Sequence, residues 1–122
     1  MDAKPHDAFQ ELNKARMNLA TKEDTVCLAA TTGMAYFRTG NDFEGRRYYE
    51  AAIELARQVG NDNLVTLAKV HFARERLLRG DKDAVLDFMK AYEAAMKLQE
   101  TNIPAVVDHM AKEIAPVVAH LK

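Results

Sequence analysis

"TGMAYFRTGNDFEGRRYYEAAIEL", residues 32–55, places small and aromatic residues at helical spacings on both sides of one turn. The turn is marked by Gly40, and residues three or four apart on either side share one face of an α-helix. We therefore predict two antiparallel helices that pack closely along this face, because residues without bulky side chains let two backbones approach. The predicted packing residues are Gly33, Tyr36, Gly45, Tyr49, Ala52 and Leu55.

Turn signals of the same kind divide the whole chain into helical windows. Glycine followed by Asn or Asp occurs at 40–42, 60–63 and 80–83, and Pro104 suits the first turn of a last helix. No window shows sustained alternation of polar and apolar residues, so we predict an all-α fold. The connections are short and force consecutive helices into antiparallel hairpins. The expected helices cover residues 5–20, 23–39, 42–59, 63–79, 82–99 and 104–121.

Two sequence segments recur along the chain. "YEAAIEL" at 49–55 returns as "YEAAMKL" at 92–98, and "TGN" at 39–41 has its counterpart in "RGD" at 79–81. The offsets indicate a repeat of about forty residues. Hairpins repeated in this way bury their apolar faces against their neighbours, because one hairpin has no core of its own.

The opening stretch resembles the tetratricopeptide repeat in its long variety of about forty residues. That signature sets a small residue and an aromatic on the first helix, a glycine in the turn, and then tyrosine, alanine and leucine on the second helix. Gly33 and Tyr36 match the first helix, and Tyr49 and Ala52 match the second. In the second repeat Arg76 occupies the place of the first-helix tyrosine. HEAT or armadillo arrays and a plain helical bundle are the alternatives.

The resemblance implies one domain over residues 1–122, built as a short right-handed solenoid of about six helices. Its parts would be a leading helix at 5–20, repeat one at 23–59, repeat two at 63–99 and a C-terminal capping helix at 104–121.

Composition argues against several classes of protein. The 122 residues carry a formal net charge of −1, which removes the basic field expected of a nucleic-acid binder. Cys27 is the only cysteine, so neither an intrachain disulfide nor a four-cysteine zinc site can form. No secretory signal and no run near ~18 apolar residues occurs. We expect a cytoplasmic protein that binds neither nucleic acid nor membrane.

No motif in the sequence indicates catalysis. The phosphate-binding loop, HExxH, GxSxG and CxxC patterns do not occur. His109 and His120 can share a helix face, but eleven residues of helix separate them by roughly 16 Å, too far for one metal ion. We expect no catalytic residue, no metal and no cofactor, and therefore a protein that is not an enzyme.

The resemblance places a ligand on the concave surface lined by the first helix of each repeat. A helical wheel gives that surface an apolar floor, and Arg38 and Arg74 would favour an acidic partner. The carboxylate clamp of some relatives needs Lys and Asn where this chain has Ala30 and Met34, so a hydrophobic protein or peptide fits better. The same apolar stripe is also what a buried core would show. The predicted partner-binding residues are Val26, Ala30, Met34, Phe37, Arg38, Leu67, Val70 and Arg74.

The last predicted helix has an amphipathic pattern that allows two interpretations. It can cap the array by packing on the fifth helix, which we favour, or it can join two chains in a homodimer through Ile114 and Val118. We predict a non-catalytic protein- or peptide-binding scaffold. The alternatives are a self-associating structural subunit and a regulatory segment of a larger signalling or transcription protein.

Overall fold

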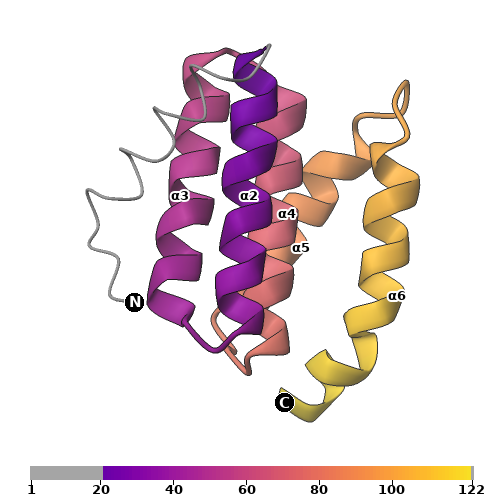
Figure 1. The fold of residues 1–122 in the computed structure, drawn as a ribbon. Helices are drawn as coiled ribbons and strands as arrows, with labels where there is room; N and C mark the ends of the chain where they lie inside the picture. Colours follow the sequence, from indigo (N-terminus) through magenta and orange to yellow (C-terminus); the bar gives the residue numbers. More distant parts are fainter. Residues whose placement is uncertain (1–20, 122) are drawn as a thin grey trace.

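The computed structural model describes residues 21–121, which form an all-α structure of five helices without a strand in that range. The predicted helix at 5–20 lies outside the described residues. Figure 1 shows the helices running up and down beside one another. They are α2 (Lys22–Arg38), α3 (Asp42–Gln58), α4 (Asp62–Leu78), α5 (Ala84–Met96) and α6 (Ile103–Leu121).

Three glycines end α2, α3 and α4 in the same way. Gly40, Gly60 and Gly80 have φ values of 86°, 72° and 87°, a left-handed conformation that costs glycine little. Asn41 then serves both helices that it joins. Its backbone N–H donates to the carbonyl oxygen of Tyr36 at 2.8 Å, and its side-chain oxygen accepts from the N–H of Glu44 at 3.3 Å. These turns are why the helices of the first hairpin match their predicted bounds within one residue.

Helix α5 is shorter than the predicted helix at 82–99 and is closed by turns at both ends. At its start, Asp83 makes no side-chain capping bond; instead its N–H donates to the Oδ1 atom of Asp81 at 3.0 Å. At its end the chain turns through a bond from the N–H of Leu98 to the carbonyl oxygen of Ala95 at 3.0 Å. This turn directs Leu98 toward the apolar cluster between α4, α5 and α6.

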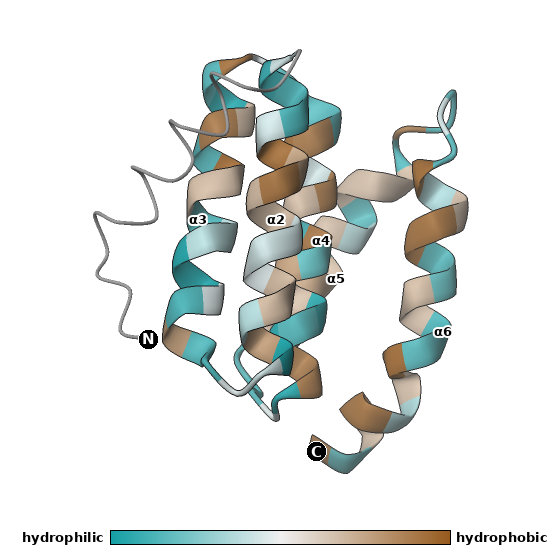
Figure 2. Cartoon of the chain, in the orientation of Figure 1, coloured by the Kyte–Doolittle hydropathy of each residue, from teal (hydrophilic) through white to brown (hydrophobic). Residues whose placement is uncertain are grey.

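Helix α4 is central, since it contacts each of the other four described helices. Each helix carries hydrophobic and hydrophilic residues (Figure 2), as expected where one face is buried. Three apolar clusters follow: one within α2–α3, one joining α2, α3 and α4, and one joining α4, α5 and α6. The middle cluster is aromatic, with the rings of Tyr49 and Phe72 stacked at 5.3 Å between centroids.

Helices α2 and α3 approach most closely at two glycines. A Cβ atom on Gly33 would lie 3.0 Å from the carbonyl oxygen of Gly45 and 2.8 Å from a ring carbon of Tyr49. A Cβ atom on Gly45 would lie 2.6 Å from the ring of Phe37. Neither position has room for a side chain, and the surrounding aromatic rings fill the space that the glycines leave.

Helix α6 packs against both α4 and α5. Ile114 is only 2% exposed, and Val118 lies partly buried against the same cluster. Ile114 and Val118, which the dimer alternative assigned to a second chain, thus pack against the cluster of α4, α5 and α6 within this chain. The helix continues through Pro116, which lacks a backbone donor, and Figure 1 shows its C-terminal turns changing direction. No described helix is both long and apolar enough to cross a bilayer.

Candidate functional site

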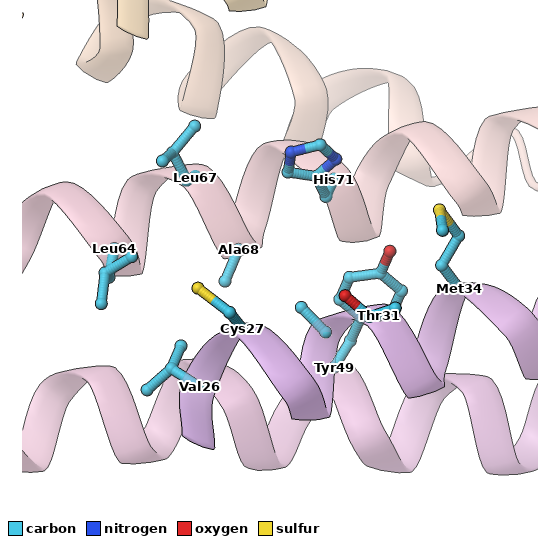
Figure 3. A pocket seen from close by; sticks show the side chains of 10 residues that line it. Val26, Cys27, Thr31, Met34, Tyr49, Leu64, Leu67, Ala68 and His71 are labelled. Carbon is cyan, nitrogen blue, oxygen red and sulfur yellow. The ribbon is translucent and has the colours of Figure 1, made fainter. Parts of the chain in front are cut away.

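A cleft of about 240 Å³ lies between α2 and α4, and we call it the α2–α4 cleft. In Figure 3, Cys27 and Met34 point from α2 toward α4, and Leu64 and Ala68 face them from α4. Most of the exposed lining is apolar, and it contains no Asp, Glu, Lys or Arg side chain. The lining residues are Val26, Cys27, Ala30, Thr31, Met34, Tyr49, Leu64, Leu67, Ala68 and His71.

Two ionisable side chains in the lining are held neutral by their surroundings. Burial lowers the pKa of His71 below its ordinary value, and the positive charge of Arg74 lowers it further, while Glu75 acts in the opposite direction. Burial also raises the pKa of Tyr49 far above its ordinary value, and Glu75 raises it again. At neutral pH the α2–α4 cleft therefore presents an uncharged imidazole and an uncharged phenol.

Glu75 determines the electrostatics beside this cleft. Its carboxylate is 2% exposed and accepts hydrogen bonds from Arg38 at 3.2 and 3.3 Å and from Arg74 at 3.2 Å. Arg74 also donates to Glu113 of α6 at 3.3 Å. The hydrogen bond with Glu75 raises the pKa of Arg38. These pairs connect α2, α4 and α6 and leave neither arginine without a counter-charge.

The two arginines therefore differ from their expected role. Arg38 and Arg74 were expected to attract an acidic partner, but Glu75 and Glu113 already neutralise them. A partner carboxylate would have to compete with a buried glutamate that belongs to the chain. The sequence could not show the pairing of Arg38, because Glu75 is 37 residues away from it.

The predicted apolar floor divides into lining residues and core residues. Val26, Ala30, Met34 and Leu67 line the α2–α4 cleft. Phe37 is 2% exposed and packs against Tyr49 and Phe72, and Val70 is fully buried in the cluster of α4, α5 and α6. Phe37 and Val70 are therefore corrected from surface to core, because α3 and α5 cover them.

Several lining residues of the cleft were absent from the predicted set. On α4 these are Leu64, Ala68 and His71, which lie three residues before, one after and four after Leu67. At about 100° per residue, these three residues lie on one side of Leu67 around the helix. The prediction followed Val70 and Arg74 instead, which lie on the neighbouring arc.

Among residues 21–121 there is also no group of three or more His, Cys, Asp or Glu side chains that could hold a metal ion.

No protein-family model, curated protein or solved structure matches this chain.

Proposed function

We propose that this chain is a non-catalytic scaffold that binds an apolar peptide or protein segment in the α2–α4 cleft. The observation that carries the proposal is an apolar cleft between α2 and α4 without a charged side chain in its lining. We further propose that the helices form a short right-handed solenoid of the tetratricopeptide type.

The order of helix contacts supports the solenoid. Each described helix contacts the next one in the chain, and α2, α4 and α6 also contact one another in sequence. In contrast, α3 and α5 make no contact with each other. Stacked hairpins produce this pattern when one helix of each hairpin lines an inner surface and the other lies outside.

The size and chemistry of the cleft support an apolar side chain as the bound group. About 240 Å³ is below the ~300–1,000 Å³ typical of cofactor or drug-sized sites. A peptide that inserts a Leu- or Phe-sized side chain would gain about 1.5–3 kcal/mol for each one fully buried. Thr31 and His71 supply polar groups at the same cleft. A charged partner residue would find no counter-charge there.

Cys27 provides the ground for proposing a cytoplasmic location. Its thiol is exposed and lies in the cleft lining. A reducing compartment would keep this thiol free, whereas an oxidising one favours its pairing with another thiol.

The experiment compares two double variants, each with one Met→Glu and one Leu→Glu substitution. One pair lies in the α2–α4 cleft and the other lies outside it. Met34→Glu with Leu67→Glu puts charge into the cleft, and Met89→Glu with Leu86→Glu puts the same charge on exposed positions of α5 outside it. Peptides selected from a displayed random library on the wild-type chain are then measured by titration calorimetry.

We expect the selected peptides to carry apolar residues and to bind the wild type and the α5 variant alike. The cleft variant should lose at least roughly tenfold in affinity, since a charge without a partner opposes burial of an apolar side chain. Thermal melts of both variants check that they fold. Equal binding by the two folded variants, or a failure to enrich any peptide, would rule out the cleft as the binding surface.

A further inference from the structure

The side of α4 opposite the α2–α4 cleft is also open. Helices α3 and α5 both pack on α4 but do not contact each other, so part of α4 between them remains uncovered. A cleft of about 310 Å³ lies there, lined by residues of α4 and α5, and we call it the α4–α5 cleft. Leu67 and Lys69 line different clefts because two residues turn a helix by about 200°.

The floor of the α4–α5 cleft is apolar. Phe72 and Ala73 contribute from α4, and Ala91 and Ala94 contribute from α5. Arg46 of α3 lies over the ring of Phe72, with its guanidinium carbon 5.5 Å from the ring centroid. The cleft therefore combines a floor of small and aromatic side chains with cationic groups around it.

The charges of this cleft do not balance. Its lining contains Lys69, Arg76 and Lys90 against one acid, Asp87. Arg76 donates to Asp87 at 2.7 Å, so the one acid of the lining is already paired. The two lysines remain without a counter-charge in the lining. Neither Lys69 nor Lys90 has a carboxylate of the described residues within ion-pair distance, and both are exposed.

A comparison of three clefts identifies where an acidic ligand fits. The α2–α4 cleft has no charged residue in its lining. The cleft between α4 and α6 contains Arg74 and Glu113, which pair with each other. Only the α4–α5 cleft, among these three, has cations in excess next to an apolar floor. The sequence assigned a preference for acidic partners to Arg38 and Arg74. The excess of positive charge lies instead in the α4–α5 cleft, on the opposite face of α4.

We propose that the α4–α5 cleft binds an acidic peptide segment that seats an apolar side chain on the apolar floor of the cleft while its carboxylates pair with Lys69 and Lys90. The apolar floor suits an apolar side chain, and the two lysines give flanking glutamates or aspartates a counter-charge on each helix. This second surface shares no lining residue with the α2–α4 cleft.

The probe is a fluorescein-labelled peptide with a central Leu-Phe pair flanked on both sides by glutamates, measured by fluorescence anisotropy at low ionic strength. Lys69→Glu with Lys90→Glu reverses the charge of the cleft. Lys82→Glu with Lys97→Glu reverses the same charge at exposed positions just before and after α5 and outside this cleft. All four lysines are exposed, so both variants should fold, and thermal melts check this.

We expect the cleft variant to raise the Kd of the peptide at least roughly tenfold and the control variant to change it less than about twofold. A peptide with serine in place of Leu-Phe should bind much more weakly than the original. The variant Met34→Glu with Leu67→Glu should bind the original peptide as the wild type does, which separates this surface from the α2–α4 cleft.

Any one of several results would overturn the proposal. They are no binding by the wild type, equal loss in the two lysine variants, unchanged binding of the serine peptide, and loss of binding in the Met34 and Leu67 variant. Displacement of the peptide by a short single-stranded DNA at equal charge would assign the lysines to phosphate and would also overturn it.

Discussion

The two hairpins α2–α3 and α4–α5 share an outline but are held together by different chemistry. In the first, the rings of Tyr36 and Tyr48 stack with centroids 5.4 Å apart. Forty residues after Tyr36 the second hairpin has Arg76, which donates to Asp81 at 2.9 Å and to Asp87 at 2.7 Å. An aromatic stack and a group of ion pairs thus occupy corresponding places in the two hairpins.

The backbone approach explains part of this difference. Gly33 lies so close to α3 that no Cβ atom fits, whereas the position forty residues later is Ala73. The ring of Tyr49 fills the space beside Gly33, and the side chain of Ala73 is buried in the second hairpin. Arg76 then extends over Phe72, 5.3 Å from the ring centroid, and reaches the acids beyond it. The turn glycines are retained in both hairpins, while the packing residues between the helices are not.

The largest expected effect comes from filling the glycine contact of the first hairpin. Gly33→Val should lower the free energy of unfolding by about 3 kcal/mol, because its side chain meets the backbone oxygen of Gly45 and the ring of Tyr49. Ala35→Val is the control, since Ala35 is exposed on the same helix and should cost no more than about 0.7 kcal/mol. Urea denaturation measures both. A Gly33→Val variant as stable as the control would mean that α2 and α3 are not in close contact.

The second prediction tests the ionic contacts of the other hairpin. Arg76→Met should cost about 2 kcal/mol, because it removes two hydrogen bonds between charged groups and leaves the partly buried Asp81 without Arg76. Arg79→Met is the matched control, because Arg79 lies three residues after Arg76 in the sequence. Its ion pair with Asp42 is exposed on both sides and should contribute at most about 1 kcal/mol. Equal costs for the two variants would show that the Arg76 pairs do not hold α4 to α5.

The third prediction concerns the aromatic stack that Arg76 replaces. Tyr36→Leu keeps an apolar side chain but removes the ring from Tyr48, so it should cost about 1 kcal/mol. Phe43→Leu is the control, because Phe43 is 60% exposed and its ring should contribute little to stability. Denaturation of both variants gives the comparison. If Phe43→Leu costs as much stability as Tyr36→Leu, the stacking of Tyr36 on Tyr48 does not stabilise the first hairpin beyond what an exposed ring contributes.

How far the sequence predicts this molecule depends on the distance between interacting residues. Short-range signals were sufficient for the ends of α2, α3 and α4, since Gly40, Gly60 and Gly80 each follow a helix near the predicted residue. Helical spacing also identified Met34 and Leu67, which line the α2–α4 cleft. These features depend on residues within a few positions of each other.

Contacts between residues far apart in the sequence could not be predicted from these short-range signals. The neutralisation of Arg38 by Glu75 joins residues 37 positions apart on different helices. The burial of Phe37 depends on Phe72 of α4, which no local spacing indicates. A helical wheel assigns a residue to a face, but which face is covered depends on how the hairpins stack. Four of the eight predicted partner-binding residues line the α2–α4 cleft, and the two predicted arginines do not.

The smallest expected effect is a pH dependence confined to the second hairpin. Burial raises the pKa of Asp81, but hydrogen bonds from Arg76 and from the N–H of Asp83, with the charges of Arg76 and Arg46, lower it more, so the net shift is downward. A carboxyl group whose pKa is lower in the folded state gives stability above its unfolded pKa, about 3.9. That stability is lost as the pH falls through the folded pKa.

Asp81→Asn should therefore be less stable than the wild type at neutral pH, and the difference should shrink as the pH falls below about 4. Thermal melts at a series of pH values measure it. In an Arg76→Met background the same Asp81→Asn change should have a smaller pH dependence, because the main partner of the carboxylate has been removed. If the two backgrounds gave the same pH dependence, Asp81 would not owe its lowered pKa to Arg76.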